Sequence, residues 1–194
     1  MTDKIILASE SPRRKELLES VGCDFCVIPP DVKEEEIPYH GSNPEEYAMK
    51  LAELKAESVS SENPKTLVLA ADTIVVADEE IYGKPKDREQ AGEMLRNLSG
   101  KRHRVITGVC IIKRDQQVKL LDYRCTDVWF DCLTEEKLQS YLDTGEYADK
   151  AGAYGIQEKG ALLVEKIEGC FFNVMGLPLN LVESMLNKTG RSLF

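Results

Sequence analysis

The chain has 194 residues, of which 42% are hydrophobic and 30% are charged, and this composition fits a globular protein with a sizeable core. Its formal net charge of −9 argues against nucleic acid or an anionic membrane as a partner, although a small anion can still bind a local basic pocket. The six cysteines are too few for a disulfide framework in a chain of this length, so we expect free thiols in a cytoplasmic protein.

The first predicted elements are a buried strand and a helix. The short run "KIILA" at residues 4–8 suits a buried strand, and its apolar stretch is too short for a signal peptide. Ser11, which precedes a proline, is placed to be the N-cap of a helix over 12–20. The first turn of this helix carries Arg13 and Arg14, although positive charges oppose the helix dipole there. The two arginines are therefore either solvated surface residues or ligands of an anion.

The next segment combines an acidic loop with a second helix. A strand is predicted over 23–29, and a polar loop follows at 29–43. Asn43 has the position and side chain of an N-cap, so a helix is expected to begin at residue 44. Lys55 borders the apolar stripe of that helix.

The centre of the chain contains an almost wholly apolar segment, which predicts a central strand over 66–78. Residues 81–87 are predicted as a turn, and a helix over 87–100 follows. The remaining predicted elements are antiparallel strands at 103–114 and 123–133, a helix capped by Thr134, an irregular stretch at 149–160, a strand at 161–169 and a helix at 177–188. Interleaved strands and helices without repeats or linkers predict an α/β fold with a mixed sheet.

Asp72 is the one charge in the middle of the apolar strand. A buried carboxylate costs several kcal/mol unless it is paired or binds a cation. Asp72 can cap a turn or pair with a buried arginine, but a role as metal ligand or general base is the favoured interpretation. One acidic residue of the loop at 31–36 can join it in holding Mg²⁺, which uses one or two carboxylates together with phosphate oxygens.

Four basic residues together predict an anion site. Lys84 lies in the predicted turn between Gly83 and Pro85, and Lys55 and the two arginines of the first helix are the other candidates. Backbone N–H groups at a helix start bind phosphate, and nearby cations neutralise it. The two histidines, His40 and His103, are too few for a histidine triad or metal cluster. The sequence also lacks the nucleophile elbow, the P-loop and the dinucleotide fingerprint.

With "LASESPRRKELL", "ADTIV", "GKPKD" and "DKAGAYGIQ", the chain resembles the Maf-like family of nucleoside triphosphate pyrophosphatases nearly from end to end. The resemblance implies one domain over 1–194, with an elongated twisted sheet flanked by helices and two lobes around a cleft. It also implies a homodimer, a divalent metal ion (Mg²⁺ or Mn²⁺), and cleavage between the α and β phosphates.

The motif "DKAGAYGIQ" resembles the branch of the family that acts on dTTP and UTP, and modified pyrimidine triphosphates are further candidate substrates. One alternative is the same reaction on 7-methyl-GTP or another non-standard purine triphosphate. Another is a regulator of cell division that binds nucleotide without turnover.

The resemblance also implies roles for individual residues. Asp72 would be the proton acceptor or a metal-side carboxylate, and Glu34 would help to bind the divalent ion. Lys55 and Lys84 would neutralise the departing pyrophosphate. The residues implied to hold phosphates are Ser9, Ser11, Arg13 and Arg14. The positions associated with substrate choice are Arg13, Thr73 and Gln157. Two departures from the family pattern are Lys33, where an acidic residue is common, and the pair Glu158 and Lys159, where small residues are common.

Overall fold

The computed structural model describes residues 4–39, 41 and 43–193, so His40 lies outside the described residues. The contacts within the chain group it into two compact units. Unit 1 comprises Met1–Asp72, Thr107–Arg124 and Gly176–Phe194, and unit 2 comprises Thr73–Ile106 and Cys125–Met175.

The strands form one mixed sheet. Its order is β2-β1-β3-β5-β6-β7, and β4 pairs with β3. The strands are β1 (Ile5–Ala8), β2 (Phe25–Val27), β3 (Val68–Ala77), β4 (Glu80–Tyr82), β5 (Arg102–Lys113), β6 (Val118–Phe130) and β7 (Val164–Glu168). Strand β1 is parallel to β2 and β3, whereas β4 and β7 are antiparallel to β3 and β6. The neighbours β5 and β6 are joined by a short connection, which only antiparallel strands allow. The predicted mixed α/β fold is confirmed.

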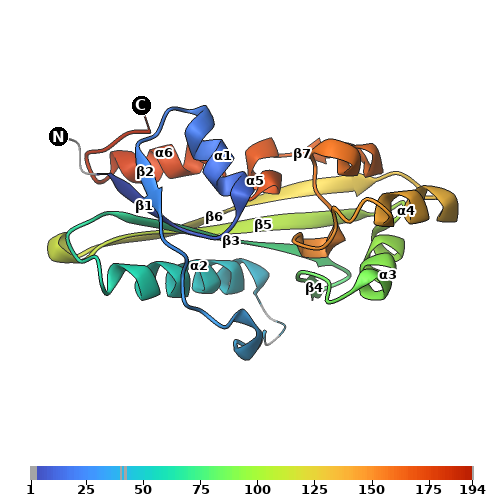
Figure 1. Cartoon of the computed structure of the whole chain (residues 1–194), viewed down its shortest axis with the longest axis horizontal. Helices are drawn as coiled ribbons and strands as arrows, with labels where there is room; N and C mark the ends of the chain where they lie inside the picture. The colour runs from blue at the N-terminus through green and yellow to red at the C-terminus, as the bar shows by residue number, and fades with distance from the viewer. Residues whose placement is uncertain (1–3, 40, 42, 194) are drawn as a thin grey trace. The chain divides into compact units, whose positions relative to one another are not determined.

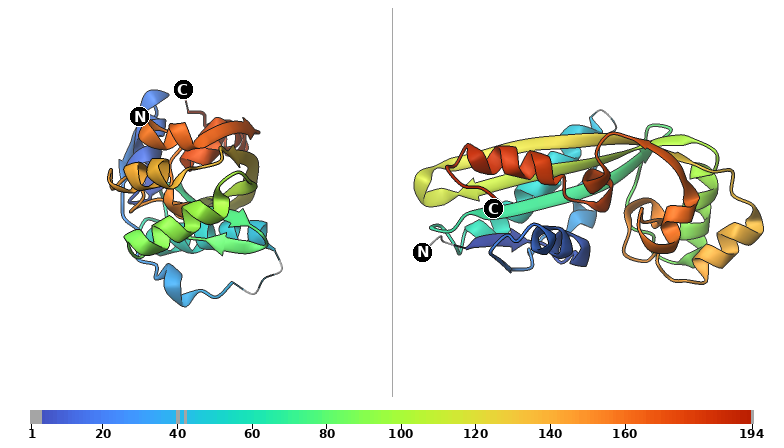
Figure 2. Two further views of the ribbon diagram at one scale, coloured as in Figure 1. Left: turned by 90° about the vertical axis from the view of Figure 1, so that its right-hand side faces the viewer. Right: turned by 90° about the horizontal axis from the view of Figure 1, so that it is seen from above.

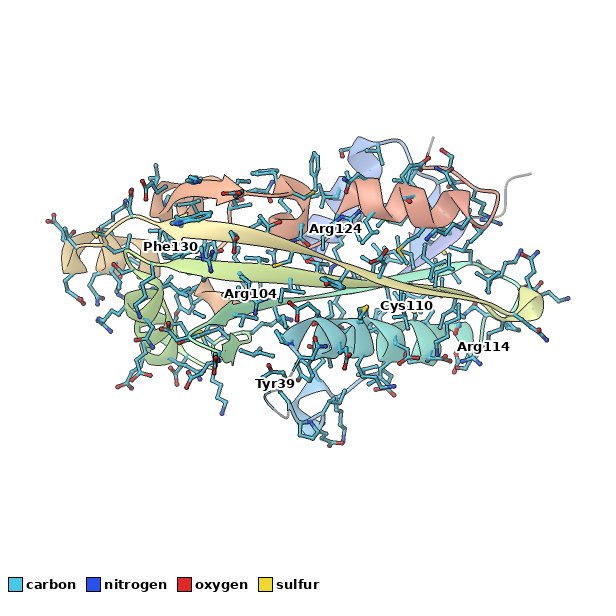
Figure 3. The ribbon with its side chains drawn as sticks, turned by 180° about the vertical axis from the view of Figure 1, so that it is seen from behind. Tyr39, Arg104, Cys110, Arg114, Arg124 and Phe130 are labelled. Atoms are coloured by element: carbon cyan, nitrogen blue, oxygen red, sulfur yellow. The ribbon has the colours of Figure 1, made fainter. Side chains whose placement is uncertain are left out.

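In unit 1, helices cover both faces of the sheet. Helix α2 (Pro44–Ser60) lies on one face, and α1 (Pro12–Ser20) and α6 (Leu179–Asn187) lie on the other (Figure 1). Cys110 of β5 belongs to the core beneath α2 (Figure 3). Helix α2 can approach β5 closely because Gly108 has no side chain. A Cβ at Gly108 would lie 2.4 Å from the backbone carbonyl carbon of Ala48. This close approach brings the side chains of α2 within reach of β3.

Unit 2 has its own core. Helices α3 (Arg88–Leu98) and α4 (Glu135–Leu142) lie side by side (Figure 2). The buried side chains that they share with the strands include Val75, Leu95, Phe130, Leu138 and Tyr154. Further short elements of this unit are η3 (Ala151–Ala153), η4 (Glu158–Leu163) and α5 (Phe171–Met175), of which the last was not predicted.

The segment predicted as a turn at 81–87 begins as a strand instead. Asp78 and Glu79 both have positive φ, at 49° and 66°, and two such residues make the tight reversal of a two-residue hairpin. Glu80, Ile81 and Tyr82 therefore fold back as β4 against the end of β3. The strand predicted over 161–169 is also shorter, because residues 161–163 belong to η4 and the strand begins at Val164.

The predicted helix starts are confirmed. Asn43 and Thr134 accept hydrogen bonds from backbone N–H groups of the first turns of α2 and α4. Ser11 occupies the N-cap position of α1, but within the described chain its side chain makes no capping hydrogen bond. The first turn of α1 therefore keeps N–H groups that its N-cap side chain does not satisfy.

Candidate active site

Hydrogen bonds of Arg14 hold the start of α1 in place. Ser9 follows β1, and its Oγ accepts hydrogen bonds from the Ser11 backbone N–H, at 3.1 Å, and from Arg14 Nη1, at 3.2 Å. Arg14 Nε donates to the Gly176 carbonyl oxygen at 2.8 Å. Burial lowers the pKa of Arg14, which is only 8% exposed, but a guanidinium remains protonated. Arg14 is thus a buried charge with fixed partners.

Arg13, its neighbour, is only partly buried on α1. The two arginines therefore differ: Arg14 holds the helix start in place, and Arg13 has more of its surface open to solvent. The opposition of two cations to the helix dipole is explained for Arg14 by its bonds to Ser9 and Gly176.

Asp72 and Lys55 form a buried ion pair. Asp72 is 4% exposed on β3, on the same face as Ala70, which packs in the core beneath α2. Lys55 projects from α2, and its Nζ lies 2.5 Å from Asp72 Oδ1. The sequence places Lys55 at the border of the apolar stripe; in the structure it is 7% exposed, because the carboxylate of Asp72 satisfies its charge.

Glu34 adds a second carboxylate to the same ammonium. It begins η1 (Glu34–Glu36), and its Oε1 lies 2.7 Å from Lys55 Nζ. The side chain of Glu34 is about half exposed, whereas those of Lys55 and Asp72 are buried. Two carboxylates of different burial therefore converge on one positive charge.

Tyr47 fixes the loop that carries Glu34. Its hydroxyl donates to the Ile37 carbonyl oxygen at 3.0 Å, and its ring packs against Tyr39, with 5.2 Å between the ring centroids. Burial and the charges of Asp72 and Glu34 raise the pKa of Tyr47, so the hydroxyl stays a donor. By its spacing Tyr47 belongs to the apolar stripe of α2, and its polar contact was not predicted. A tyrosine among aliphatic residues is the signal that was available, because a buried hydroxyl needs a partner.

The environment of Asp72 favours proton transfer. Burial raises the pKa of its carboxyl above the ordinary value, while the positive charges of Lys55 and Arg14 act in the opposite direction. A carboxylate with a raised pKa is a stronger base toward a water molecule.

The carboxylate pair fits a divalent cation of the magnesium type. No group of three His, Cys, Asp or Glu side chains able to hold a metal occurs in the described part of the chain. Asp72 and Glu34 nevertheless already gather two oxygens around one cationic atom. Mg²⁺ commonly uses one or two carboxylates and completes its coordination with water and substrate phosphates, so this donor set is suitable.

The other predicted site residues belong to unit 2. Thr73 follows Asp72 on β3 and is partly buried, Lys84 is exposed after β4, and Gln157 is partly buried in the irregular stretch. The Gly152 N–H donates to the Gly83 carbonyl at 3.1 Å, which ties the turn of Lys84 to that stretch. Gly152 has φ +68°, and a Cβ there would lie 3.0 Å from Val75, so a glycine is required.

The structure thus joins the candidates into sets. In unit 1, direct contacts connect Ser9 with Arg14, and Lys55 with both Glu34 and Asp72. In unit 2, a backbone hydrogen bond connects the segments that carry Lys84 and Gln157. The role of the Gly176 carbonyl was not predicted, because a sequence pattern cannot identify the partner of a backbone group.

Known proteins resemble this chain along nearly its whole length. The family described as Maf-like protein matches residues 4–189. The dTTP/UTP pyrophosphatase of Carboxydothermus hydrogenoformans is 49% identical over 176 residues, which cover 91% of this chain and 93% of that relative. The dTTP/UTP pyrophosphatase of Clostridioides difficile is 47% identical over 184 residues, or 95% of this chain and 94% of that relative.

A solved structure shares the fold at low sequence identity. The HAM1 protein from Coxiella burnetii aligns with a TM-score of 0.51 and 15% identity, covering 96% of this chain and 100% of that one. This likeness concerns the fold alone. The family match and the identity to two curated relatives carry the classification: the chain belongs to the Maf family.

Proposed function

We propose that this protein is a nucleoside triphosphate pyrophosphatase that hydrolyses dTTP and UTP to the monophosphate and pyrophosphate. The observation that carries the proposal is the buried Lys55 ammonium between Asp72 and Glu34, beside a helix start that holds Arg13 and Arg14. It is supported by relatives named dTTP/UTP pyrophosphatase that are 49% and 47% identical.

Asp72 and Glu34 would hold the divalent ion, Mg²⁺ or Mn²⁺. When bound, such an ion polarises a phosphoryl oxygen and lowers the pKa of a coordinated water molecule.

The chain's own residues account for the rest of the reaction. Asp72, the more buried carboxylate with the raised pKa, accepts a proton from water as the water oxygen attacks the α-phosphorus. The bond from that phosphorus to the oxygen shared with the β-phosphorus breaks, and pyrophosphate leaves with the bonding electrons. Lys55 and Lys84 neutralise the charge that develops on it. Ser9, Ser11, Arg13 and Arg14, with the N–H groups of α1, hold the phosphates.

Substrate choice would rest on Arg13, Thr73 and Gln157. An amide such as that of Gln157 offers both a donor and an acceptor, which matches the edge of uracil or thymine. A methylated guanine presents a different pattern of donors and acceptors.

The proposal includes the setting in which the protein works. Residues 1–194 would act as one catalytic domain in a cytoplasmic homodimer, as the family resemblance implies. The net charge of −9 opposes nucleic acid or a membrane surface as partner, whereas a small anionic substrate can still bind a local basic pocket. No helix among the described residues is long and apolar enough to span a membrane.

The test is a panel of triphosphates with Mg²⁺ or Mn²⁺, in which pyrophosphate and orthophosphate are detected separately. We expect the highest kcat/KM for dTTP and UTP, with pyrophosphate as product. A preference for 7-methyl-GTP or inosine triphosphate would show that the protein catalyses the same reaction on a purine nucleotide. Tight binding without any product after long incubation would support the regulator of cell division instead.

A further inference from the structure

Lys55 lies between the two carboxylates that the proposed function assigns to a divalent cation. Its Nζ is 2.5 Å from Asp72 Oδ1 and 2.7 Å from Glu34 Oε1. A divalent cation on those oxygens would lie close to the ammonium. Like charges at such a separation repel strongly where water is largely excluded, so the two cations cannot share the position.

Burial makes one of these cations necessary at all times. Asp72 lies in an apolar strand, and an unpaired buried carboxylate is strongly destabilising. Arg14 is near enough to affect the pKa of Asp72, but its Nε and Nη1 already donate to the Gly176 carbonyl and Ser9 Oγ. Lys55 is therefore the counter-ion that any metal ion has to replace.

Lys55 is also able to move. A lysine carries its charge on a flexible four-carbon stem with three donor hydrogens, so the ammonium can turn to new acceptors without a change in the backbone. Its second partner, Glu34, is about half exposed, so the ammonium has a path from Asp72 toward solvent.

We propose that Lys55 is an exchangeable counter-ion, whose ammonium neutralises Asp72 and Glu34 until a divalent cation takes over both carboxylates. The released ammonium is then available to the phosphate oxygens of the substrate. The exchange makes and breaks only ion pairs, and it rests on the proposed function for the identity of the anion that Lys55 meets next. Binding of the metal ion is thereby coupled to release of the Lys55 ammonium toward the leaving group.

The first test measures Mn²⁺ binding in the absence of nucleotide, with the free ion detected by electron paramagnetic resonance. The variant Lys55→Met should bind Mn²⁺ about tenfold more tightly. An opposite charge in contact lowers the proton affinity of a carboxylate by about tenfold or more, and the removal of Lys55 should raise the affinity for a metal ion by at least the lower end of that range. Lys50→Met is the matched control, because Lys50 lies on the same helix and pairs with Glu53 at the surface. Unchanged or weaker binding by a folded Lys55→Met protein overturns the proposal.

The second test uses the unaltered chain, so it does not depend on the folding of a variant. Acetylation of Lys55 by acetic anhydride, measured by mass spectrometry, should increase several-fold when Mg²⁺ is added. No increase would overturn the exchange. Neither test contains a triphosphate. Tighter Mn²⁺ binding by Lys55→Met, together with no hydrolysis of dTTP by the unaltered protein, would thus refute the proposed function and keep the exchange at the carboxylate pair.

Discussion

The two units present their candidate residues in different ways. In unit 1, Lys55 and Asp72 are buried and already paired, and Arg14 is fixed by two hydrogen bonds. In unit 2, Lys84 is exposed and Gln157 is partly buried, and they lie in a turn and an irregular stretch that are joined through the backbone. Buried, prearranged charges stabilise a developing charge most strongly, because they need not reorganise when it forms. Under the proposed function, the prearranged charges of unit 1 would therefore serve the chemical step, and Lys84 and Gln157 of unit 2 would contribute to charge neutralisation and substrate choice.

Asp72→Asn should show the largest effect if this contrast holds. Loss of the base is expected to lower kcat by about 10²- to 10⁴-fold, measured as pyrophosphate release from dTTP. The melting temperature should fall as well, since Lys55 loses a charged partner in a buried setting. Asp24→Asn is the matched control, because Asp24 pairs with Lys4 at the surface, and neither quantity should change. Retained turnover in Asp72→Asn would remove Asp72 from the chemical step.

Lys84→Ala should affect activity but not stability. The loss of one charge-assisted contact with phosphate is expected to lower kcat/KM for dTTP by about 10- to 100-fold. The melting temperature should stay the same, because the side chain is exposed. Lys86→Ala, two residues further along the same exposed segment, is the control and should behave like the unaltered protein. Equal kcat/KM values for the two variants would contradict a role for Lys84.

Gln157→Ala should act on substrate choice alone. A hydrogen bond between neutral groups contributes about 0.5–1.5 kcal/mol, so KM for dTTP should rise by about tenfold or less while kcat is retained. The measurement is the ratio of kcat/KM for dTTP and CTP, with the exposed Lys159→Ala as control. An unchanged ratio would show that another residue reads the base.

Unit 2 also buries a titratable side chain, that of His103, next to its core. His103 is 2% exposed, its Nε2 lies 2.6 Å from the Tyr154 hydroxyl oxygen, and its Nδ1 has no hydrogen-bond partner in the described structure. Burial lowers the pKa of His103 to about 4, from 6.5. Between these two pH values the unfolded chain binds a proton that the folded chain does not.

The free energy of unfolding should therefore decrease as pH falls from about 6.5 to about 4, by up to about 3 kcal/mol from this group. Below pH 4 its contribution should stay level, because both states are then protonated. Urea unfolding at several pH values should show a shallower decrease in His103→Gln. Tyr154→Phe, which keeps the histidine buried, should retain the decrease. Equal pH dependence of His103→Gln and the unaltered protein would contradict this assignment.

The sequence predicts individual site residues better than their arrangement. Asp72 could be identified because a single charge in an apolar strand demands a partner. Lys55 could be identified from its position beside the stripe of α2, but its burial could not, since burial depends on how closely α2 packs at Gly108. The contact between Glu34 and Lys55 follows from the course of a loop, which local patterns do not specify.

The parts of the fold that escaped prediction depend on backbone conformations that ordinary residues rarely adopt. The β4 hairpin requires positive φ at Asp78 and Glu79, where sequences more commonly carry Asn or Gly. The short helix α5 and the 3₁₀ segment at Glu158–Leu163 lack the length needed for a periodic pattern.

The hydrogen bond from Arg14 to Gly176 has a consequence for biosynthesis, because it joins residues 162 positions apart. During translation at about 5–20 residues per second, the start of α1 leaves the ribosome on the order of ten seconds before its partner carbonyl is made. A nascent chain that stops short of Gly176 carries both arginines, Asp72 and Lys55, yet lacks the bond that seats the first helix. The start of α1 is thus among the first parts of the protein to be synthesised and among the last to be completed.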